Sequence, residues 1–276
     1  EGFTPEFAAW KDRIETVYRL PGMQHVTISP HLTRILRDQF GIRAHEICNA
    51  IDHDVHYPAP PSIPQKGRVR IGLVGPYQVP LKGIRTGIEA CRLAAAAGLD
   101  GELVRVTSAT RHGDERDLPF PVEWHERVRP ERMGEIYRSL DVFLGTSNAI
   151  EEGFSLPAVE AMACGIPCVL TDIPCFRAHG DGQYALFVPP DDAAAMAEAL
   201  VLASRVGDVR TALRTAGLEA ASRYTLDAHG EGLLAALEQA VAAVRGTTPR
   251  IREAKTATAQ SSTPTDSDFA PVVRLL

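Results

Sequence analysis

The chain has 276 residues, 45% of them hydrophobic, and a formal net charge of −6. This is enough apolar material for a packed core in one or two domains. The negative charge argues against a general nucleic-acid-binding surface. No apolar run approaches the ~20 residues of a membrane span and no N-terminal signal peptide is visible. We therefore expect a cytoplasmic protein whose membrane association is at most peripheral.

The cysteines are odd in number and sit mostly in apolar runs, which favours buried free thiols in a reducing compartment. The spacing Cys164-x3-Cys168 is not usual for zinc, and no pair of histidines accompanies it. We expect no bound metal. The full set is Cys48, Cys91, Cys164, Cys168 and Cys175.

Residues 1–58 are expected to form the end of an N-terminal domain. The pattern predicts a short strand over Gln24–Ser29, a helix that opens at Ser29-Pro30 and stops at Gly41, and a further strand over Ala44–Ile51. An apolar stripe before them predicts a first helix, carried by Phe7, Trp10, Ile14, Val17 and Tyr18.

Strands and helices alternate from Val69 onward, which is typical of a parallel α/β sheet. We predict a doubly wound domain over residues 67–246. Its strands are expected at Val69–Val74, Leu103–Val106, Val122–Glu126, Asp141–Gly145, Cys168–Thr171 and Ala185–Val188. Its helices are expected at Gly83–Ala97, Pro130–Arg138, Ser155–Cys164, Asp192–Ser204, Asp208–Tyr224 and Asp227–Val244.

Two segments of different composition flank this domain. Prolines are concentrated in Tyr57–Pro64, which predicts a stiff linker that we place at residues 59–66. The Thr/Ser/Ala-rich tail at residues 247–276 predicts disorder. The chain begins with Glu1 instead of Met, as a fragment or a processed protein would.

The stretch Asn148–Gly165 combines an anion site with two carboxylates. Ser155 stands where an N-cap belongs, and the amides of Phe154, Ser155 and Leu156 would point out of the helix start towards an anion. Glu152 precedes the helix and Glu160 lies within its first two turns. Carboxylates repel phosphate but accept hydrogen bonds from sugar hydroxyls. A diphosphate between two sugars fits this layout, as in a nucleotide-sugar.

The segment Glu152-Gly153-Phe-Ser-Leu-Pro-Ala-Val-Glu160-Ala-Met-Ala-Cys-Gly resembles the E-x7-E signature of family 4 retaining glycosyltransferases, which have the GT-B fold. The resemblance implies a Rossmann-like C-terminal half that binds a nucleotide-sugar and needs no cofactor or metal. It also implies that Glu160 holds the donor ribose, that Glu152 orients the transferred sugar and that the turn amides bind the diphosphate. The neighbouring Glu151 is expected to face solvent.

Two further loops resemble donor-binding parts of the same family. Gly75-Pro-Tyr-Gln-Val-Pro-Leu-Lys82-Gly83 resembles its G-R-x(n)-K-G loop, which implies that Lys82 contacts the diphosphate and stabilises the leaving group. The family arginine is absent because Pro76 follows Gly75, and Arg85 is a candidate substitute. The loop around Val128 and Arg129 corresponds to the place where the family holds the nucleobase.

Other polar residues in predicted loops are weaker candidates. Thr107, Ser108 and Arg111 stand at a strand end and could touch ribose or phosphate, but ordinary loop roles are the commoner explanation. His179 is a lone histidine, and Phe176 is expected to be packing.

The resemblance also implies parts that residues 1–58 do not supply. In a GT-B enzyme the acceptor site and a functional histidine come from the N-terminal domain, so we expect a missing N-terminal domain or a partner chain. The acceptor would be a glycan, a lipid or another molecule, as in polysaccharide biosynthesis. The alternatives are a non-catalytic nucleotide-sugar-binding module or partner subunit of a transferase, and a GT-B phosphorylase or epimerase. No pyridoxal phosphate features support the phosphorylase.

Overall fold

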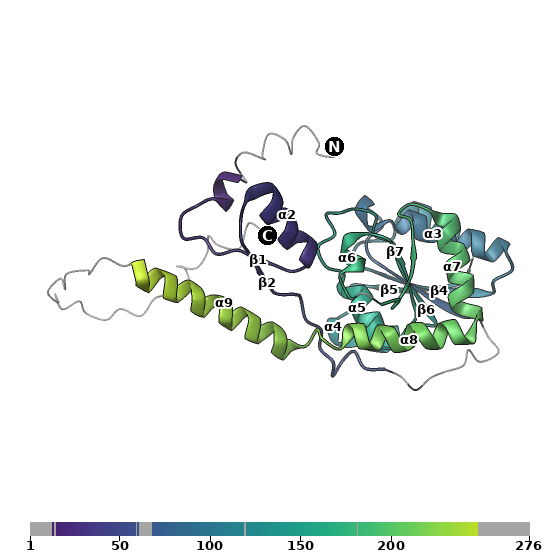
Figure 1. Ribbon diagram of the computed structural model, residues 1–276. Helices are drawn as coiled ribbons and strands as arrows, with labels where there is room; N and C mark the ends of the chain where they lie inside the picture. Colours follow the sequence, from purple (N-terminus) through teal and green to yellow (C-terminus); the bar gives the residue numbers. More distant parts are fainter. Residues whose placement is uncertain are drawn as a thin grey trace, which may run out of the picture.

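The computed structural model describes residues 13, 15–58, 60, 68–118, 120–180 and 182–247 (Figure 1). Several predicted features lie outside these residues: Phe7, Trp10, Ile14, nearly all of the 59–66 linker, and the tail beyond 247. Within the described residues, no helix is long and apolar enough to cross a membrane.

A six-stranded parallel sheet forms the centre of the molecule, in the order β5-β4-β3-β6-β7-β8. The sequence order runs outward in one direction from β3 to β5 and then in the other from β6 to β8, which confirms the predicted doubly wound fold. The strands are β3 Val69–Val74, β4 Gly101–Thr107, β5 Val122–Glu126, β6 Val142–Gly145, β7 Cys168–Thr171 and β8 Leu186–Val188.

Helices cover both faces of this sheet (Figure 1). On one face α3 packs against α7, and on the other α5 packs against α4 and α8. Apolar side chains at helical spacing on each inner face make this packing possible. The helices of this part of the chain are α3 Ile84–Ala96, α4 Pro130–Arg138, α5 Leu156–Ala163, α6 Pro174–Arg177, α7 Ala193–Arg205 and α8 Gly207–Ala221. The last helix, α9 Leu226–Thr247, extends away from the sheet (Figure 1).

The predicted and observed boundaries differ in a few places. The predicted helix over Asp208–Tyr224 ends earlier, at Ala221. Three short helical turns were not predicted: η1 Pro80–Lys82, η2 Gly113–Glu115 and α6. Each has only three or four residues, too few for a periodic pattern to show in the sequence.

The N-terminal segment forms a separate small sheet. Strand β1 Val26–Thr27 pairs in parallel with β2 His45–Glu46, and helix α2 Pro30–Phe40 connects them. Both strands are shorter than the predicted Gln24–Ser29 and Ala44–Ile51, because in the described residues each pairs only with the other.

The start of helix α9 and the turn before it contact this segment. The Nδ1 atom of His229 lies 2.8 Å from the carbonyl oxygen of Cys48, and the amide of Ile51 donates to the carbonyl of Tyr224 at 3.0 Å. These contacts connect the start of α9 and the turn before it to the N-terminal segment.

All five cysteines are free thiols, as predicted, and four are buried while Cys48 is half-buried. Burial raises the pKa of the Cys91 and Cys164 thiols to about 12, so both are protonated near neutral pH.

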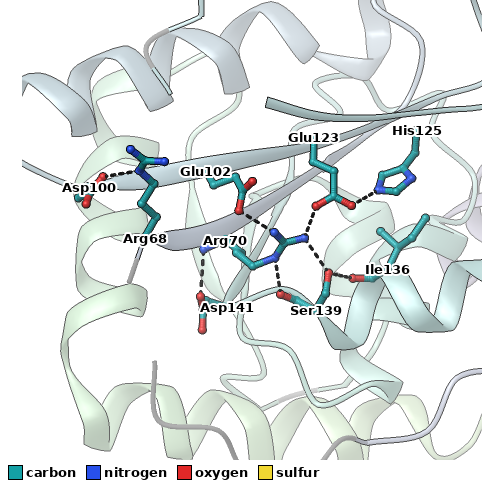
Figure 2. Close-up of polar contacts among 9 residues, drawn as sticks. All are labelled: Arg68, Arg70, Asp100, Glu102, Glu123, His125, Ile136, Ser139 and Asp141. Atoms are coloured by element: carbon teal, nitrogen blue, oxygen red, sulfur yellow. Dashed lines mark hydrogen bonds and ion pairs between the residues drawn. The ribbon is translucent and has the colours of Figure 1, made fainter. Parts of the chain in front are cut away.

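The amino edge of the sheet is held by one arginine (Figure 2). Arg70 donates from Nη1 to Glu102 and from Nη2 to Glu123, both at 2.6 Å, and from Nε to the Ser139 carbonyl at 2.9 Å. Its backbone amide donates to Asp141 at 2.9 Å. These bonds join β3, β4 and β5 to the end of α4.

Candidate functional site

The carboxyl ends of β3 and β6 meet where the strand order reverses, and both predicted motifs follow these strands. The loop after β3 carries Gly75 and Lys82, and the loop after β6 carries Ser147 and Glu152. In open α/β sheets, ligands bind in the crevice outside this reversal point.

Lys82 is positioned by bonds between these two loops. The amide of Asn148 donates to the Leu81 carbonyl at 2.9 Å, and the hydroxyl of Thr146 donates to the Lys82 carbonyl at 2.6 Å. Gly83 has a φ of 59°, and a Cβ there would lie 1.9 Å from the carbonyl oxygen of Thr146. Only glycine permits this approach, which explains the Lys-Gly pair.

Glu152 is buried and accepts two hydrogen bonds at one oxygen. Its Oε2 accepts from Lys82 Nζ at 2.6 Å and from the Ser147 hydroxyl at 2.7 Å. The predicted pair Lys82 and Glu152 is therefore in direct contact. Ser147 is a third member that the sequence did not single out, although its place two residues after the end of buried strand β6 was a signal.

The start of α5 keeps free amide donors. Ser155 is the N-cap residue, as predicted, but its side chain makes no capping bond. The amides of Phe154 and Leu156 bond to no other described residue. The ring of Phe154 lies edge-on to His179 and Tyr224, with centroids 5.4 and 5.2 Å away. These contacts hold the turn before α5 against the core.

Glu160 lies deeper, on the side of α5 that faces α4. Its Oε2 accepts from the Tyr137 hydroxyl at 2.8 Å, and its Oε1 lies 3.9 Å from His56 Nε2. Burial raises the pKa of Glu160 above its usual value. Neither Tyr137 nor His56 was predicted, because each is distant in sequence and lies among residues with ordinary packing patterns.

Arg85 is not brought into this cluster. Its side chain is 82% exposed, and its partners are the Tyr77 hydroxyl at 3.2 Å and Asp114 at 3.8 Å. Tyr77 itself stacks on His112 with ring centroids 4.5 Å apart. These contacts join the loop after β3 to the loop after β4.

The remaining candidates divide into a loop position and packing positions. Val128 is half-buried beside Arg127, whose φ of 52° turns the chain sharply after β5. Arg111 lies over the Trp124 ring at 4.2 Å, and Phe176 is buried as expected. His179 is fully buried against Tyr224, and burial lowers its pKa to about 4. Among the described residues no cluster of His, Cys, Asp or Glu is placed to hold a metal ion.

Residues 68–204 match a family model described as glycosyl transferases group 1. The phosphatidyl-myo-inositol mannosyltransferase of Mycobacterium leprae is 31% identical over 209 residues, which is 72% of this chain and 54% of that protein. The D-inositol 3-phosphate glycosyltransferase of Saccharomonospora viridis is 34% identical over 126 residues, 44% of this chain and 29% of that one. The chain thus spans about half, or less, of the length of these relatives.

Solved structures share the fold. A glycosyltransferase from Rickettsia africae matches with a TM-score of 0.67 at 15% identity, over 87% of this chain and 68% of that one. The C-terminal domain of a group 1 glycosyltransferase from Francisella tularensis matches with a TM-score of 0.54 at 22% identity, over 64% of this chain and 99% of that domain. The sheet of the present chain therefore has the architecture of such a C-terminal domain.

Proposed function

The chain belongs to the group 1 glycosyltransferase family, and on that premise we propose that it binds a nucleotide diphosphate-sugar and takes part in transferring the sugar, with retention, to an acceptor. The observation that carries the proposal is the contact of Lys82 with Glu152 beside the free amides of Phe154 and Leu156. A cation, a carboxylate and two amide donors therefore lie together where the strand order reverses. They occupy the positions at which this sequence resembles the family motifs.

The chemistry follows from these groups. Negative charge grows on the diphosphate as the bond to the sugar breaks, and Lys82 with the turn amides would stabilise it. The dipole of α5 adds to this field. Once Lys82 turns to the diphosphate, Glu152 is released to accept hydrogen bonds from the transferred sugar. Glu160 would accept the ribose hydroxyls.

A second candidate function is a non-catalytic nucleotide-sugar-binding module. The specific observation in its favour is the loss of one cation, since Pro76 replaces the family arginine and Arg85 turns to Asp114 instead. A diphosphate would then meet one positive side chain in this loop. Weak binding without transfer is the expected behaviour of such a module.

Isothermal titration with UDP-, GDP-, ADP- and dTDP-sugars tests the donor site. Mannose donors come first, because relatives are named mannosyltransferases. We expect binding that Glu160→Ala weakens and that Glu198→Ala, an exposed carboxylate on α7, leaves unchanged. If no donor binds, or if Glu160→Ala binds with unchanged affinity, the proposed nucleotide-sugar site is wrong.

A transfer assay then separates enzyme from module. The chain is joined to its native upstream sequence, supplied with the donor that binds, and assayed for sugar transfer to inositol-bearing and glycan acceptors. Transfer that Lys82→Met abolishes supports the enzyme. Binding without transfer supports the module.

A further inference from the structure

Three side chains from separate segments meet around the second glutamate of the motif. Glu160 comes from α5, Tyr137 from α4, and His56 from the turn that follows the N-terminal segment. Tyr137 donates to one carboxylate oxygen, while the other oxygen faces His56 Nε2 across 3.9 Å. The Glu160 side chain is 17% exposed, so it retains a face for a ligand.

The tautomer of His56 follows from its other nitrogen. Nδ1 lies 3.1 Å from the backbone carbonyl oxygen of Asp52. A carbonyl oxygen only accepts, so Nδ1 carries a hydrogen and donates. Nε2 is therefore the ring atom left to interact with Glu160, and it is buried with no hydrogen-bond partner among the described residues.

Helix α4 holds His56 in this place. Arg138 donates to the Val55 carbonyl at 2.7 Å, and its guanidinium lies 3.9 Å from the centre of the Tyr57 ring. A Cβ on Gly134 would lie 2.0 Å from the same Val55 carbonyl, so the turn sits directly on the helix backbone. These contacts with α4 therefore hold the imidazole of His56 beside Glu160.

Two acceptors facing each other without a donor are unfavourable in a buried site. A proton held between Nε2 and Oε1 removes this conflict and joins the two groups. Burial raises the pKa of Glu160 and so favours a bound proton on the pair. The other ionisable groups around Glu160 are Tyr137 and Arg138 from α4 and Cys164 from α5.

We propose that His56 is a positioning residue that, together with Tyr137, orients the Glu160 carboxylate to accept the ribose hydroxyls of the donor. This inference rests on the proposed function, because it assigns a partner to its ribose-binding residue. It also gives the segment before the linker a direct part in donor binding.

The test compares His56→Phe and His56→Gln with the unaltered chain. Phe keeps an aromatic ring against Tyr137, whose ring centroid is 6.0 Å from that of His56, but it removes the donor. Gln can place an amide N–H near the position of Nε2 and does not titrate. Isothermal titration is run from pH 6 to 8.5 with the nucleotide-sugar that the unaltered chain binds most tightly, because its diphosphate does not titrate in this range.

We expect His56→Phe to weaken binding about tenfold at pH 7, the size of one hydrogen bond to a charged group. His56→Gln should restore most of that loss. The unaltered chain should bind more weakly as the pH rises and the pair loses its proton, whereas His56→Gln should show a flat profile. Thermal melting checks that each variant is folded, and if His56→Phe is not, the profile of His56→Gln alone decides.

A second arm isolates the ribose. At pH 7.5, the loss in His56→Phe should appear with a ribonucleoside diphosphate and vanish with its 2′,3′-dideoxy counterpart, because a general structural defect would weaken both. If Glu160→Gln weakens binding while His56→Phe binds normally with an unchanged pH profile, the role of His56 is wrong and the donor site stands. If the unaltered chain binds no nucleotide at all, the proposed function itself fails.

Discussion

The two edges of the central sheet, at the amino and carboxyl ends of its strands, each carry a group of charged side chains in contact, and the groups differ in how many of their hydrogen-bond donors are already used. At the amino edge, Arg70 donates to two carboxylates and to the Ser139 carbonyl, while Asp141 takes its amide (Figure 2). At the carboxyl edge, Lys82 has a single carboxylate partner among the described residues and stands beside free helix amides.

This difference separates a structural cluster from a candidate site. Arg70 already makes four side-chain hydrogen bonds within the fold, so few of its donors are left for a ligand. The groups at the carboxyl edge can gain bonds from a ligand without losing an equal number. Unused donors at a strand-order reversal are thus a better indicator of binding than charge density alone.

Removal of the Lys82 charge should have the largest effect. Lys82→Met should weaken nucleotide-sugar binding about 100-fold, since a hydrogen bond to a charged group contributes about 1.5–3 kcal/mol and the diphosphate would lose the one from Lys82. It should also lower the free energy of unfolding by about 3 kcal/mol, because buried Glu152 loses its cation and keeps only the hydrogen bond from Ser147. Titration calorimetry and urea denaturation measure the two effects.

Lys82→Arg is the matched control and should keep most of the stability. Normal binding by Lys82→Met would show that the carboxyl edge is as closed to ligands as the amino edge.

A side chain at Gly83 should separate the two loops of the site. Gly83→Ala should lower the free energy of unfolding by about 3 kcal/mol, because the new Cβ meets the Thr146 carbonyl in addition to an unfavourable φ. Gly98→Ala is the control, since Gly98 has a φ of 81° and open space around it. It should cost about 1 kcal/mol. Equal losses in both variants would contradict the close approach.

The amino edge should affect stability and leave binding alone. Arg70→Met should lower the free energy of unfolding by about 2 kcal/mol, because two partly buried carboxylates lose their partner. Nucleotide affinity should stay within twofold. The control Arg68→Met removes one exposed pair with Asp100 and should cost less than about 0.5 kcal/mol. A large loss of nucleotide affinity in Arg70→Met would contradict the conclusion that the Arg70 cluster is structural and takes no part in binding.

The stability that the Arg70 cluster contributes should fall at acidic pH. The hydrogen bond from Arg70 lowers the pKa of Glu123 below its usual value. Its contribution to stability is therefore present above the unfolded-state pKa and is lost as the pH falls through the lower, folded-state pKa. Urea denaturation in this acidic range should show a smaller loss of stability in Arg70→Met than in the unaltered chain. Equal losses would exclude the pair as a cause.

The smallest effect is expected at Arg85. Arg85→Ala should change nucleotide-sugar affinity less than about twofold, because the exposed guanidinium is directed to Tyr77 and Asp114. Arg92→Ala, on the same helix, is the control. A fivefold or larger loss in Arg85→Ala alone would make it the substitute for the missing family arginine.

Local patterns of residues were enough to predict the alternation of strands and helices and the place of the E-x7-E stretch. Apolar periodicity is a local property, so β3 could be predicted at its observed bounds, Val69–Val74, and α5 to within one residue of Leu156–Ala163 at each end. The three short helical turns, η1, η2 and α6, could not be predicted because three or four residues are too few to show helical periodicity.

Which of the site's side chains come into contact depends on how distant segments pack together. Lys82 and Glu152 are 70 positions apart, and their contact depends on two loops leaving adjacent parallel strands. His56 and Tyr137 reach Glu160 from two further segments, and Arg85 turns away because Asp114 and Tyr77 lie beside it. Such contacts arise from the packing of whole elements, to which local periodicity is insensitive.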